Sequence, residues 1–129
     1  MREDNTMNAD YTAVATLAET YARAFHEGDA ATLRTLFLPD CRLQFVAEGA
    51  LKLFLASEWI DIVANRPSAA SQGHEQRSAL RSIQFAGPHC ATVMLEMVTP
   101  TQLFVDVLHL LRPADGWRIV AKAFHSELI

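Results

Sequence analysis

The sequence of 129 residues has only two cysteines, and no apolar run in it approaches the roughly 20 residues of a membrane span. Cys41 and Cys90 stand in no metal or redox spacing, so we expect two free thiols, not bridged to each other, in a reducing cytosol. The start of the chain is polar and lacks an apolar signal core, and residues 1–8 are expected to be flexible. These absences favour a cytoplasmic protein that does not contact a membrane.

Basic residues are also scarce. The chain has 11 Lys and Arg against 15 Asp and Glu, a formal net charge of −4. A surface that follows nucleic-acid phosphates needs clustered Lys and Arg, so a nucleic-acid partner is not expected. There is no Gly-rich phosphate loop and no nucleophile elbow, and the histidines have no spacing that builds a metal site. The sequence predicts neither a metal nor another cofactor.

What the chain does contain is the pattern of one α+β domain over residues 1–129. Half of its residues are hydrophobic and 20% are charged, which is ordinary globular composition. Apolar side chains at three- and four-residue spacing predict a long first helix, and two shorter helices follow. Their expected limits are Asn8 or Asp10 to Gly28, Asp29 to Pro39, and Ser57 to Pro67.

Strand patterns occupy the rest of the chain. Alternating or apolar runs are separated by turn residues at about 41–46, 51–53, 76–85, 90–99, 101–112 and 117–125. Because short turns force neighbouring strands to be antiparallel, the last four runs should form a meander. The expected order is two helices, a strand pair, a third helix and then four strands.

Side chains alternate between the two faces of a strand, so the inner face of the meander can be deduced. In the fourth predicted strand the odd positions, which include Leu95, are all apolar and should face inward. A two-residue loop then pairs Leu95 with Asp106, and a four-residue loop pairs Asp106 with Ala123 and Phe104 with His125. The inner face is therefore predicted to carry both Asp106 and His125, with His125 one step diagonal to Asp106.

The outer face of the same strands is too apolar to be left in water. It is predicted to include Met94, Val105, Val107 and Phe124. The helices are expected to cover the inner face, which leaves no element for the outer one. A second copy of the chain is the simplest cover, so we expect a homodimer formed through the outer face of the sheet.

Two parts of the sequence resemble a known family. The opening and the ending that carry the resemblance are Tyr21-Ala-Arg-Ala-Phe-His-Glu-Gly-Asp29, Leu36-Phe-Leu-Pro-Asp-Cys-Arg-Leu43, Asp106-Val-Leu-His-Leu-Leu111, Asp115-Gly-Trp-Arg-Ile-Val120 and Lys122-Ala-Phe-His125. The Gly-Trp-Arg-Ile-Val run is similar to the ending of nuclear transport factor 2-like (SnoaL-like) domains. The Asp-x-Leu-x-Leu-Leu strand and the Lys-x-Phe-His tail resemble the subgroup of putative lumazine-binding proteins.

This resemblance implies a cone-shaped, cystatin-like α+β fold, in which a curved antiparallel sheet holds three helices on its concave face, and it implies a homodimer. The superfamily includes ketosteroid isomerases, a dehydratase, polyketide cyclases, epoxide hydrolases and non-catalytic binding modules, so the fold does not fix the function. The isomerases' pair of acids beside a tyrosine is not carried over, because only Asp106 is placed on the inner face.

Asp106 and His125 are the candidate catalytic residues. A carboxylate among apolar neighbours is costly to bury unless it is paired or neutral, and burial raises its pKa toward the range of a general base. The structural alternative is that Asp106 anchors a helix N-terminus or a tyrosine hydroxyl. His125 could pair with Asp106 as a base, or it could be a histidine at the rim.

Aromatic and apolar side chains supply the candidate ligand-binding residues, and plain core packing is the alternative for each. The candidates are Tyr21, Phe25, Trp59, Leu95, Phe104 and Trp117. Tyr21 could direct its hydroxyl at a ligand or at Asp106. Arg112 is expected to form a cation–π contact with Trp117.

Two classes of function remain open at this point. The first is a pocket protein for a small apolar molecule that catalyses cofactor-independent proton transfer or hydration and dehydration, with Asp106 as base. The second is a non-catalytic homodimeric module that binds a ligand or a protein. An enzyme would be expected to show at least two polar groups that converge on the inner face. The alternation of the strands places only one acid there, Asp106.

Overall fold

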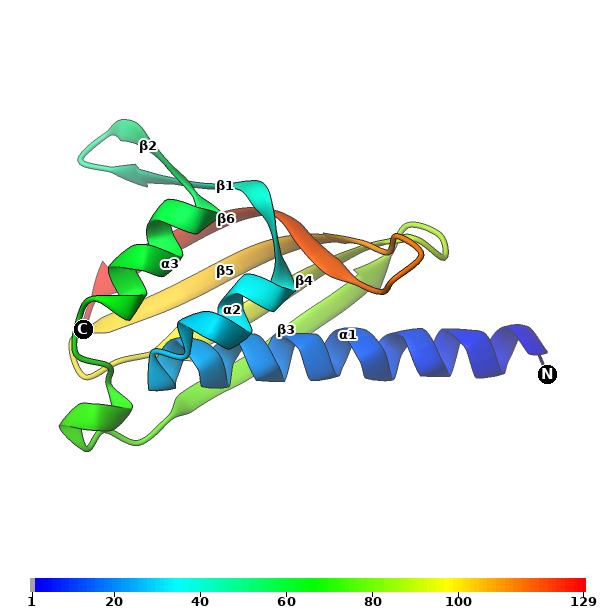
Figure 1. The fold of residues 1–129 in the computed structure, drawn as a ribbon, viewed down its shortest axis with the longest axis horizontal. Coiled ribbons are helices and arrows are strands. Elements are labelled where there is room, and N and C mark those ends of the chain that lie inside the picture. Colours follow the sequence, from blue (N-terminus) through cyan, green and yellow to red (C-terminus); the bar gives the residue numbers. More distant parts are fainter. Residues whose placement is uncertain (1) are drawn as a thin grey trace.

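The structure is a computed structural model that describes the backbone of residues 2–129 and the side chains of residues 8–129. Its elements are shown in Figure 1. Their bounds are α1 Arg2–Glu27, α2 Ala30–Leu36, β1 Phe37–Ala47, β2 Ala50–Leu55, α3 Ala56–Ala64, the short 3₁₀ helix η1 Ala70–Gln72, β3 Arg77–Phe85, β4 Cys90–Val98, β5 Gln102–Leu111 and β6 Arg118–Leu128. The predicted element order is confirmed.

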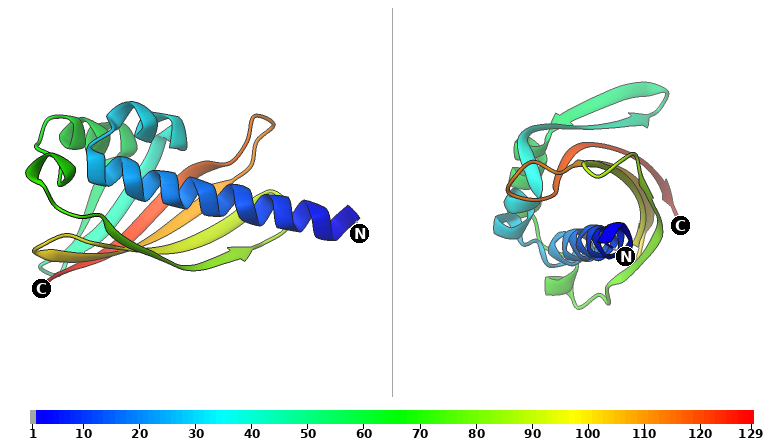
Figure 2. Two further views of the ribbon diagram at one scale, coloured as in Figure 1. Left: turned by 90° about the horizontal axis from the view of Figure 1, so that it is seen from below. Right: turned by 90° about the vertical axis from the view of Figure 1, so that its right-hand side faces the viewer.

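The six strands form one sheet in the order β2-β1-β6-β5-β4-β3. All neighbours are antiparallel except β1 and β6, which run parallel. The sheet is strongly curved, and α1 lies along its concave side, as the end-on view in Figure 2 shows. The predicted α+β fold with a cone-like curved sheet is confirmed, and the parallel β1–β6 pair is an addition to it.

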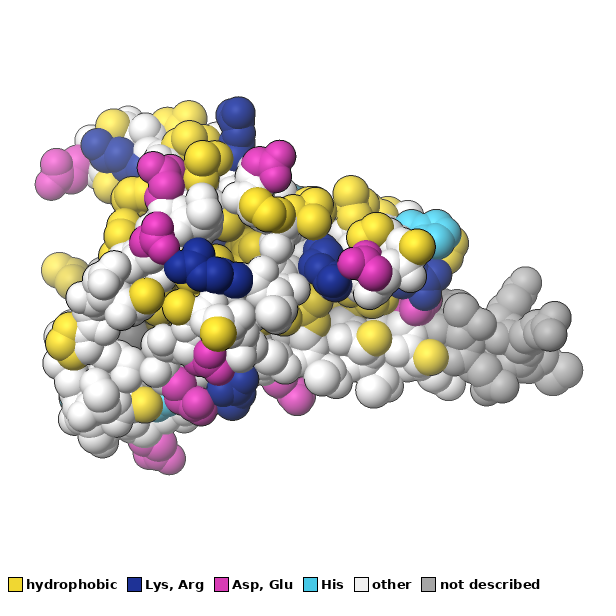
Figure 3. Space-filling model, in the orientation of Figure 1, with side chains coloured by type: hydrophobic (Ala, Val, Ile, Leu, Met, Phe, Trp, Pro, Cys, Tyr) yellow, Lys and Arg dark blue, Asp and Glu magenta, His cyan; other side chains and the backbone are white. Residues whose placement is uncertain are grey.

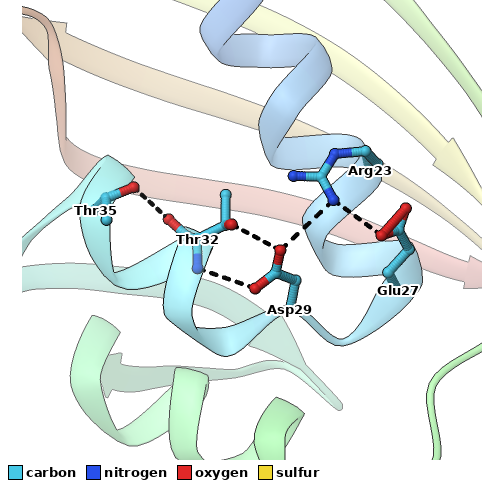
Figure 4. A network of polar contacts seen from close by, with 5 residues as sticks. All are labelled: Arg23, Glu27, Asp29, Thr32 and Thr35. Atoms are coloured by element: carbon cyan, nitrogen blue, oxygen red, sulfur yellow. Dashed lines mark hydrogen bonds and ion pairs between the residues drawn. The ribbon is translucent and has the colours of Figure 1, made fainter.

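The corner between α1 and α2 is built by local hydrogen bonds (Figure 4). Gly28 takes a left-handed conformation at φ +69°, which ends α1. Asp29 then caps α2: its carboxylate accepts from the Thr32 amide at 3.1 Å and from the Thr32 hydroxyl at 2.6 Å. These hydrogen bonds, helped by Arg23, hold the pKa of Asp29 below its usual value. The predicted cap at Asp29 is confirmed.

Other predicted helix limits were wrong. The first helix begins at Arg2, so Asn8 and Asp10 lie inside it; Asp10 instead accepts a hydrogen bond from Arg112 at 2.7 Å. Residues 1–8 were predicted to be flexible. The backbone of residues 2–8 is helical, and the side chains of residues 1–7 lie outside the described part of the chain. The third helix begins one residue before Ser57, because Glu58 accepts from the Leu55 amide at 2.8 Å.

Pro39 does not end α2, which stops at Leu36, and it lies instead within β1. The pairing of β1 with β6 is irregular between Phe37 and Arg42. A proline has no amide hydrogen to donate, and an irregular stretch of a strand is where it does least harm. The strand therefore starts four residues earlier than the predicted Cys41.

The predicted pairing of β4 with β5 is confirmed, including Met97 with Phe104 and Leu95 with Asp106. The pairing of β5 with β6 begins as predicted, with Leu110 opposite Ile119. His109 then pairs with Ala121, which leaves Val120 as an extra residue in β6. This is a β-bulge, and it reverses which side chains face inward along the rest of the strand.

The bulge corrects the predicted inner face beyond Val120. Asp106 lies opposite Phe124 rather than Ala123, and Phe104 lies opposite Ser126 rather than His125. Phe124, which was predicted on the outer face, consequently turns to the concave side together with Lys122. His125, which was predicted on the inner face, is consequently turned outward, and its side chain is 67% exposed.

The buried core joins the apolar stripe of α1 to the concave face of the sheet. Val14, Ala18 and Tyr21 from α1 and Leu108 and Leu110 from β5 are all fully buried. Hydrophobic side chains also reach the surface on the β1–β2 hairpin, at the top of Figure 3. The exposed ones there are Val46, Leu51 and Leu53.

The two cysteines are both free, as predicted. Cys41 is buried in β1, and Cys90 begins β4. Strands β6 and β5 lie between these two strands in the sheet. Over the described residues, no helix is both long enough and apolar enough to span a bilayer.

Candidate functional site

A cavity of about 320 Å³ opens between α1, α3 and the concave face of the sheet. Its volume falls in the range of small-molecule sites. Every strand from β1 to β6 except β3 contributes to its wall, and so do both of these helices. The lining residues are Phe25, Leu43, Phe45, Phe54, Trp59, Ile62, Arg66, Met97, Gln102, Phe104, Asp106, Lys122, Phe124 and Ser126.

Six of the fourteen lining residues are aromatic. Phe45 of β1 stacks on Phe124 of β6 with ring centroids 4.6 Å apart, and Phe54 stacks on Phe45 at 6.0 Å. On the helix side, Phe25 stacks on Trp59 at 5.9 Å. Packed rings of this kind favour a flat, largely apolar guest.

Three polar side chains meet at one end of this cavity, and none of the three is exposed beyond 5%. The Tyr21 hydroxyl donates to Asp106 Oδ2 at 2.6 Å, and Lys122 Nζ donates to the Tyr21 oxygen at 2.7 Å. Lys122 Nζ is also 3.4 Å from Asp106 Oδ2. Asp106 and Lys122 line the cavity, whereas Tyr21 lies behind them. We call these three residues the polar trio.

Each member of the polar trio arrives from a different element. Tyr21 belongs to the buried stripe of α1, and Asp106 belongs to the inward set of β5. Lys122 reaches the same place only because of the bulge at Val120, which turns it from the outer face to the inner one. Bulges frequently redirect a side chain at functional sites.

Burial shifts the pKa values of Lys122 and Tyr21, because it removes both side chains from water. Burial is the main cause that lowers the pKa of Lys122 below its usual 10.5, and nearby Arg66 lowers it further, while Asp106 opposes both. Burial, followed by the Asp106 charge, raises the pKa of Tyr21 well above 10. The tyrosine hydroxyl is therefore held in its protonated form, and burial favours the neutral amine of Lys122.

Aromatic rings also surround the lysine. Its Nζ lies 4.2 Å from the centroid of Trp59, 4.9 Å from that of Phe124 and 5.4 Å from that of Tyr21. Such contacts stabilise a positive charge that has lost its water. On the other side of the pair, Asp106 Oδ1 is buried and has no hydrogen-bond partner among the described residues. A buried carboxylate oxygen normally has one, so Oδ1 is an unsatisfied acceptor on a residue that lines the cavity.

Only some of the predicted ligand-binding residues line the cavity. Phe25, Trp59 and Phe104 line the cavity. Leu95 is part of the packed core, and Tyr21 is covered by the lysine and the carboxylate that it binds. Of the two alternatives for the Tyr21 hydroxyl, the structure shows the contact with Asp106.

Trp117 lies away from this cavity, where it packs against Phe85 at 6.0 Å and under the Arg112 guanidinium at 5.6 Å. The predicted cation–π contact is thereby confirmed. His125, predicted beside Asp106, is on the opposite face of β6 because of the bulge, and its nearest acid is Glu127 at 3.9 Å. A role for His125 as partner of Asp106 is not compatible with this arrangement.

The cavity residues that were not predicted as site residues include Lys122, Phe124, Phe45 and Arg66. Lys122 and Phe124 were assigned to the wrong face by strict alternation. A signal was present, since the alternation Lys122, Phe124, Ser126 places an aromatic ring inward, whereas Ala121, Ala123, His125 does not. Arg66 follows α3, and its guanidinium lies 5.7 Å from the Phe25 ring at the mouth of the cavity.

The donor set does not resemble a metal centre. Among the described residues, no three His, Cys, Asp or Glu side chains lie close enough together to hold a metal ion. The charged groups on the cavity wall are one carboxylate, one amine and one guanidinium. They can hydrogen-bond a carbonyl oxygen and exchange a proton with a bound molecule.

Comparisons with known proteins agree with the fold. The family described as "Putative lumazine-binding" matches residues 9–125. The aldolase FrzH of Cladobotryum sp is 28% identical over 121 residues, which cover 92% of this chain and 93% of that protein. An NTF2-like protein of unknown function from Silicibacter pomeroyi has a TM-score of 0.83 at 24% identity, covering 94% of this chain and 98% of its own.

A second NTF2-like structure, from Shewanella baltica, has a TM-score of 0.82 at 19% identity and covers 92% of this chain and 94% of its own. A ketosteroid isomerase-like protein from Erwinia carotovora atroseptica has a TM-score of 0.65 at 12% identity, with 88% and 92% covered. At these identities the structural likeness shows the fold alone. The matched family spans nearly the whole chain, and the protein therefore belongs to the "Putative lumazine-binding" family.

Proposed function

We propose that this protein binds a small, largely apolar aldehyde or ketone in the aromatic cavity and removes a proton from the carbon next to the carbonyl group, without a cofactor. Asp106 is the base. The observation that carries the proposal is its carboxylate, fully buried on the cavity wall, with Oδ1 unpartnered among the described residues.

The shape of the cavity supports an apolar guest that carries one polar group. Its wall is mostly aromatic and aliphatic, and the charged groups converge at one end on Asp106 and Lys122. A guest bound by its rings would therefore present its single polar atom to the polar trio. A carbonyl oxygen, which only accepts hydrogen bonds, suits the Lys122 amine as donor.

The polar trio also suits the charge that develops during proton removal. When a base takes a proton beside a carbonyl, negative charge moves to the carbonyl oxygen. A hydrogen-bond donor already fixed in a buried site stabilises that charge more than water would. Lys122 Nζ is held by Tyr21 at 2.7 Å and faces Asp106 at 3.4 Å, so donor and base are close enough to act on one small group.

The similarity to a protein named as an aldolase supports the same reading. Aldol addition begins with loss of a proton beside a carbonyl, so the step assigned to Asp106 would be shared. The similarity extends over 92% of this chain.

Deuterium exchange tests the proposal directly. The probe is 2-decalone, a bicyclic ketone, and proton NMR in D₂O follows the loss of its hydrogens beside the carbonyl. We expect wild type to accelerate exchange over buffer and Asp106→Asn to lose roughly 10²- to 10⁴-fold of that rate, the usual contribution of a positioned base. Asp10→Asn is the matched control, because Asp10 is also a buried acid but lies outside the cavity. Exchange no faster than buffer with wild type would contradict the proposal.

A non-catalytic binding protein is the second candidate. It is favoured by one observation: Asp106 is the only carboxylate among the residues that line the cavity. Trp59 lines the cavity and Trp117 does not, so in a Trp117→Phe background the fluorescence of Trp59 reports on the cavity alone. Quenching by 2-decalone without catalysed exchange would favour this second candidate.

We also propose that the protein forms a homodimer through the outer face of the sheet. Met94, Val105 and Val107 lie on that face and are partly exposed in the single chain, which supports the proposal. Val107→Lys would place a charge in a buried interface and should give monomers or aggregates. Sedimentation at micromolar concentration checks this, and a monomeric wild type would contradict it.

A further inference from the structure

We infer that the Lys122 amine is a nucleophile that forms an imine with the bound carbonyl compound, which makes the cavity a site for enamine chemistry. This inference rests on the proposed function, because the same cavity must first admit an aldehyde or ketone. It adds a covalent step and a second catalytic residue, and it specifies a class of reaction: carbon–carbon bond formation between two carbonyl compounds.

The position of the lysine is the first support. The chain has only two lysines, Lys52 and Lys122. Lys52 is exposed on the edge strand β2, where a lysine is an ordinary solvated residue. Lys122 is 5% exposed, lines an apolar cavity and extends toward the one carboxylate there. A buried lysine in an enclosed site is costly to keep, so its place in this cavity calls for a role.

The state of the amine is the second support. An imine forms only from a neutral amine, and burial together with Arg66 favours the neutral form of Lys122. The rings of Trp59 and Phe124 lie 4.2 and 4.9 Å from Nζ. They would stabilise the positive charge that returns to this nitrogen once the imine is protonated.

Proton carriers stand next to the nitrogen. The Tyr21 oxygen is 2.7 Å from Nζ, and Asp106 Oδ2 is 2.6 Å from the Tyr21 oxygen. A proton can therefore pass along one short chain of hydrogen bonds between the amine and the carboxylate. The same carboxylate lies 3.4 Å from Nζ, within reach of a carbon attached close to that nitrogen.

These groups complete a balanced reaction. The neutral amine adds to the carbonyl carbon, the C=O π pair moves to oxygen, and an amine proton is transferred there to give a carbinolamine. A proton delivered through Tyr21 and Asp106 lets that hydroxyl leave as water, and a protonated imine remains. Asp106 then takes a proton from the adjacent carbon; the C–H pair forms the enamine C=C, and the C=N π pair returns to nitrogen.

The enamine carbon then bonds to the carbonyl carbon of an aldehyde, and the proton held by Asp106 passes to the aldehyde oxygen. Water adds to the new protonated imine and releases a β-hydroxy carbonyl product, which restores the amine. One water is lost and one is gained, and no oxidant or reductant is consumed.

There is room for the second reactant. A second cavity of about 300 Å³ adjoins the first and shares Phe25, Arg66 and Phe104 with it. The aldehyde can be a separate molecule there or a second carbonyl group of the same extended substrate.

Reductive trapping tests the inference. Wild type is incubated with 2-decalone and sodium cyanoborohydride, which reduces an imine to a stable secondary amine, and the adduct is located by mass spectrometry of peptides. We expect the adduct on Lys122, its retention in Lys52→Arg and its loss in Lys122→Arg. Lys122→Met should also lose roughly a hundredfold or more of the deuterium exchange rate, since the enamine route would be closed.

The possible failures are distinguishable. Catalysed exchange with no adduct on Lys122 would overturn the imine and leave the proposed function standing. An adduct that forms equally on Lys52 and Lys122 would be adventitious surface chemistry and would also overturn the inference. Absence of both exchange and adduct would overturn the inference together with the proposed function. Peptide mapping of wild type decides these cases even if Lys122→Met does not fold.

Discussion

A cation, a carboxylate and a tryptophan come together at two places in the molecule, one beyond the end of β5 and one on the cavity wall, and the two sets differ in burial. At the end near the start of α1, Arg112 pairs with Asp10 at 2.7 Å and lies over Trp117 at 5.6 Å. The Arg112 and Asp10 side chains keep 29% and 11% of their surface exposed. Water can still reach this pair.

At the cavity end, Lys122 faces Asp106 at 3.4 Å and lies over Trp59 at 4.2 Å. These two side chains are 4% and 1% exposed. Arginine is always protonated, so the first set can only be an anchor between α1 and the residue that follows β5. Lysine can lose its proton when it is buried, so the second set can do chemistry. Exchanging arginine for lysine beside the same two residue types thus separates a structural contact from a set suited to a reaction.

The largest expected effect concerns the stability of the buried pair. Asp106→Leu leaves the Lys122 amine buried without its partner and should lower the free energy of unfolding by about 3–5 kcal/mol. The double variant Asp106→Leu with Lys122→Met removes both polar groups and should recover most of that loss while remaining inactive in the exchange assay. Urea unfolding measures all three proteins. A single variant that costs under about 1 kcal/mol would show that the pair is not truly buried.

The pH dependence of stability should also differ between the two ends. The pKa of Lys122 is below 10.5 in the folded protein, so between these two values unfolding takes up a proton. The stability that depends on this residue is therefore lowest below the depressed pKa and rises with pH until 10.5. Thermal melts from pH 7 to 10 should show wild type gaining stability relative to Lys122→Met. A constant difference would contradict a depressed pKa.

Tyr21 and Cys41 make the stability fall as the pH rises, which is opposite to the effect of Lys122. The pKa of Tyr21 is raised above 10 and burial raises that of Cys41 from 9.0 to about 11, so each folded group keeps a proton that the unfolded chain loses. Their contributions to stability decline as the pH rises above the unfolded values. Both residues remain in Lys122→Met, but the Lys122 charge lowers the pKa of Cys41, so part of the difference between the two proteins comes from Cys41.

A smaller effect is expected at the anchor. Asp10→Asn removes the charge of a pair that water can reach, and Arg112 stays solvated and in contact with Trp117. The loss should be about 1 kcal/mol or less, with no change in exchange activity. Urea unfolding beside the exchange assay checks both parts. A loss of activity with Asp10→Asn would mean that the Asp10–Arg112 pair affects the cavity, and it would contradict a purely structural role for that pair.

The smallest effect is expected from Arg66→Gln. Arg66 lies at the cavity mouth, and its positive charge lowers the pKa of Lys122. Removing that charge should raise the lysine pKa slightly and leave the fold unchanged, because the Arg66 side chain is exposed. A lysine NMR titration measures the change. A further fall in the Lys122 pKa would contradict the assigned direction.

Most of the fold followed from the sequence because local rules and tertiary packing agree in it. The cap at Asp29, the end of α1 at Gly28 and the pairing of Leu95 with Asp106 each depend on neighbouring residues or on a short loop. The parallel pairing of β1 with β6 was not predicted, because no short connection joins these strands.

Two members of the polar trio could be predicted and the third could not. Asp106 lies in an unbroken alternation, so its inward position was evident, and Tyr21 lies on the apolar stripe of α1. Lys122 lies beyond Val120, where one extra residue reverses every later side chain. Neither glycine nor proline marks that bulge in the sequence, so strict alternation placed His125 on the inside and the lysine outside.

The most direct test of the account is the titration of the two lysines by ¹³C NMR of lysine-labelled protein. With only Lys52 and Lys122 in the chain, two Cε signals are expected, and Lys122→Met assigns them. The account predicts that the Lys122 signal titrates clearly below the ordinary 10.5, as an amine held in an apolar cavity should. A Lys122 signal that titrates at 10.5 or above would contradict it, because the cavity would then hold a permanently charged lysine and no available nucleophile.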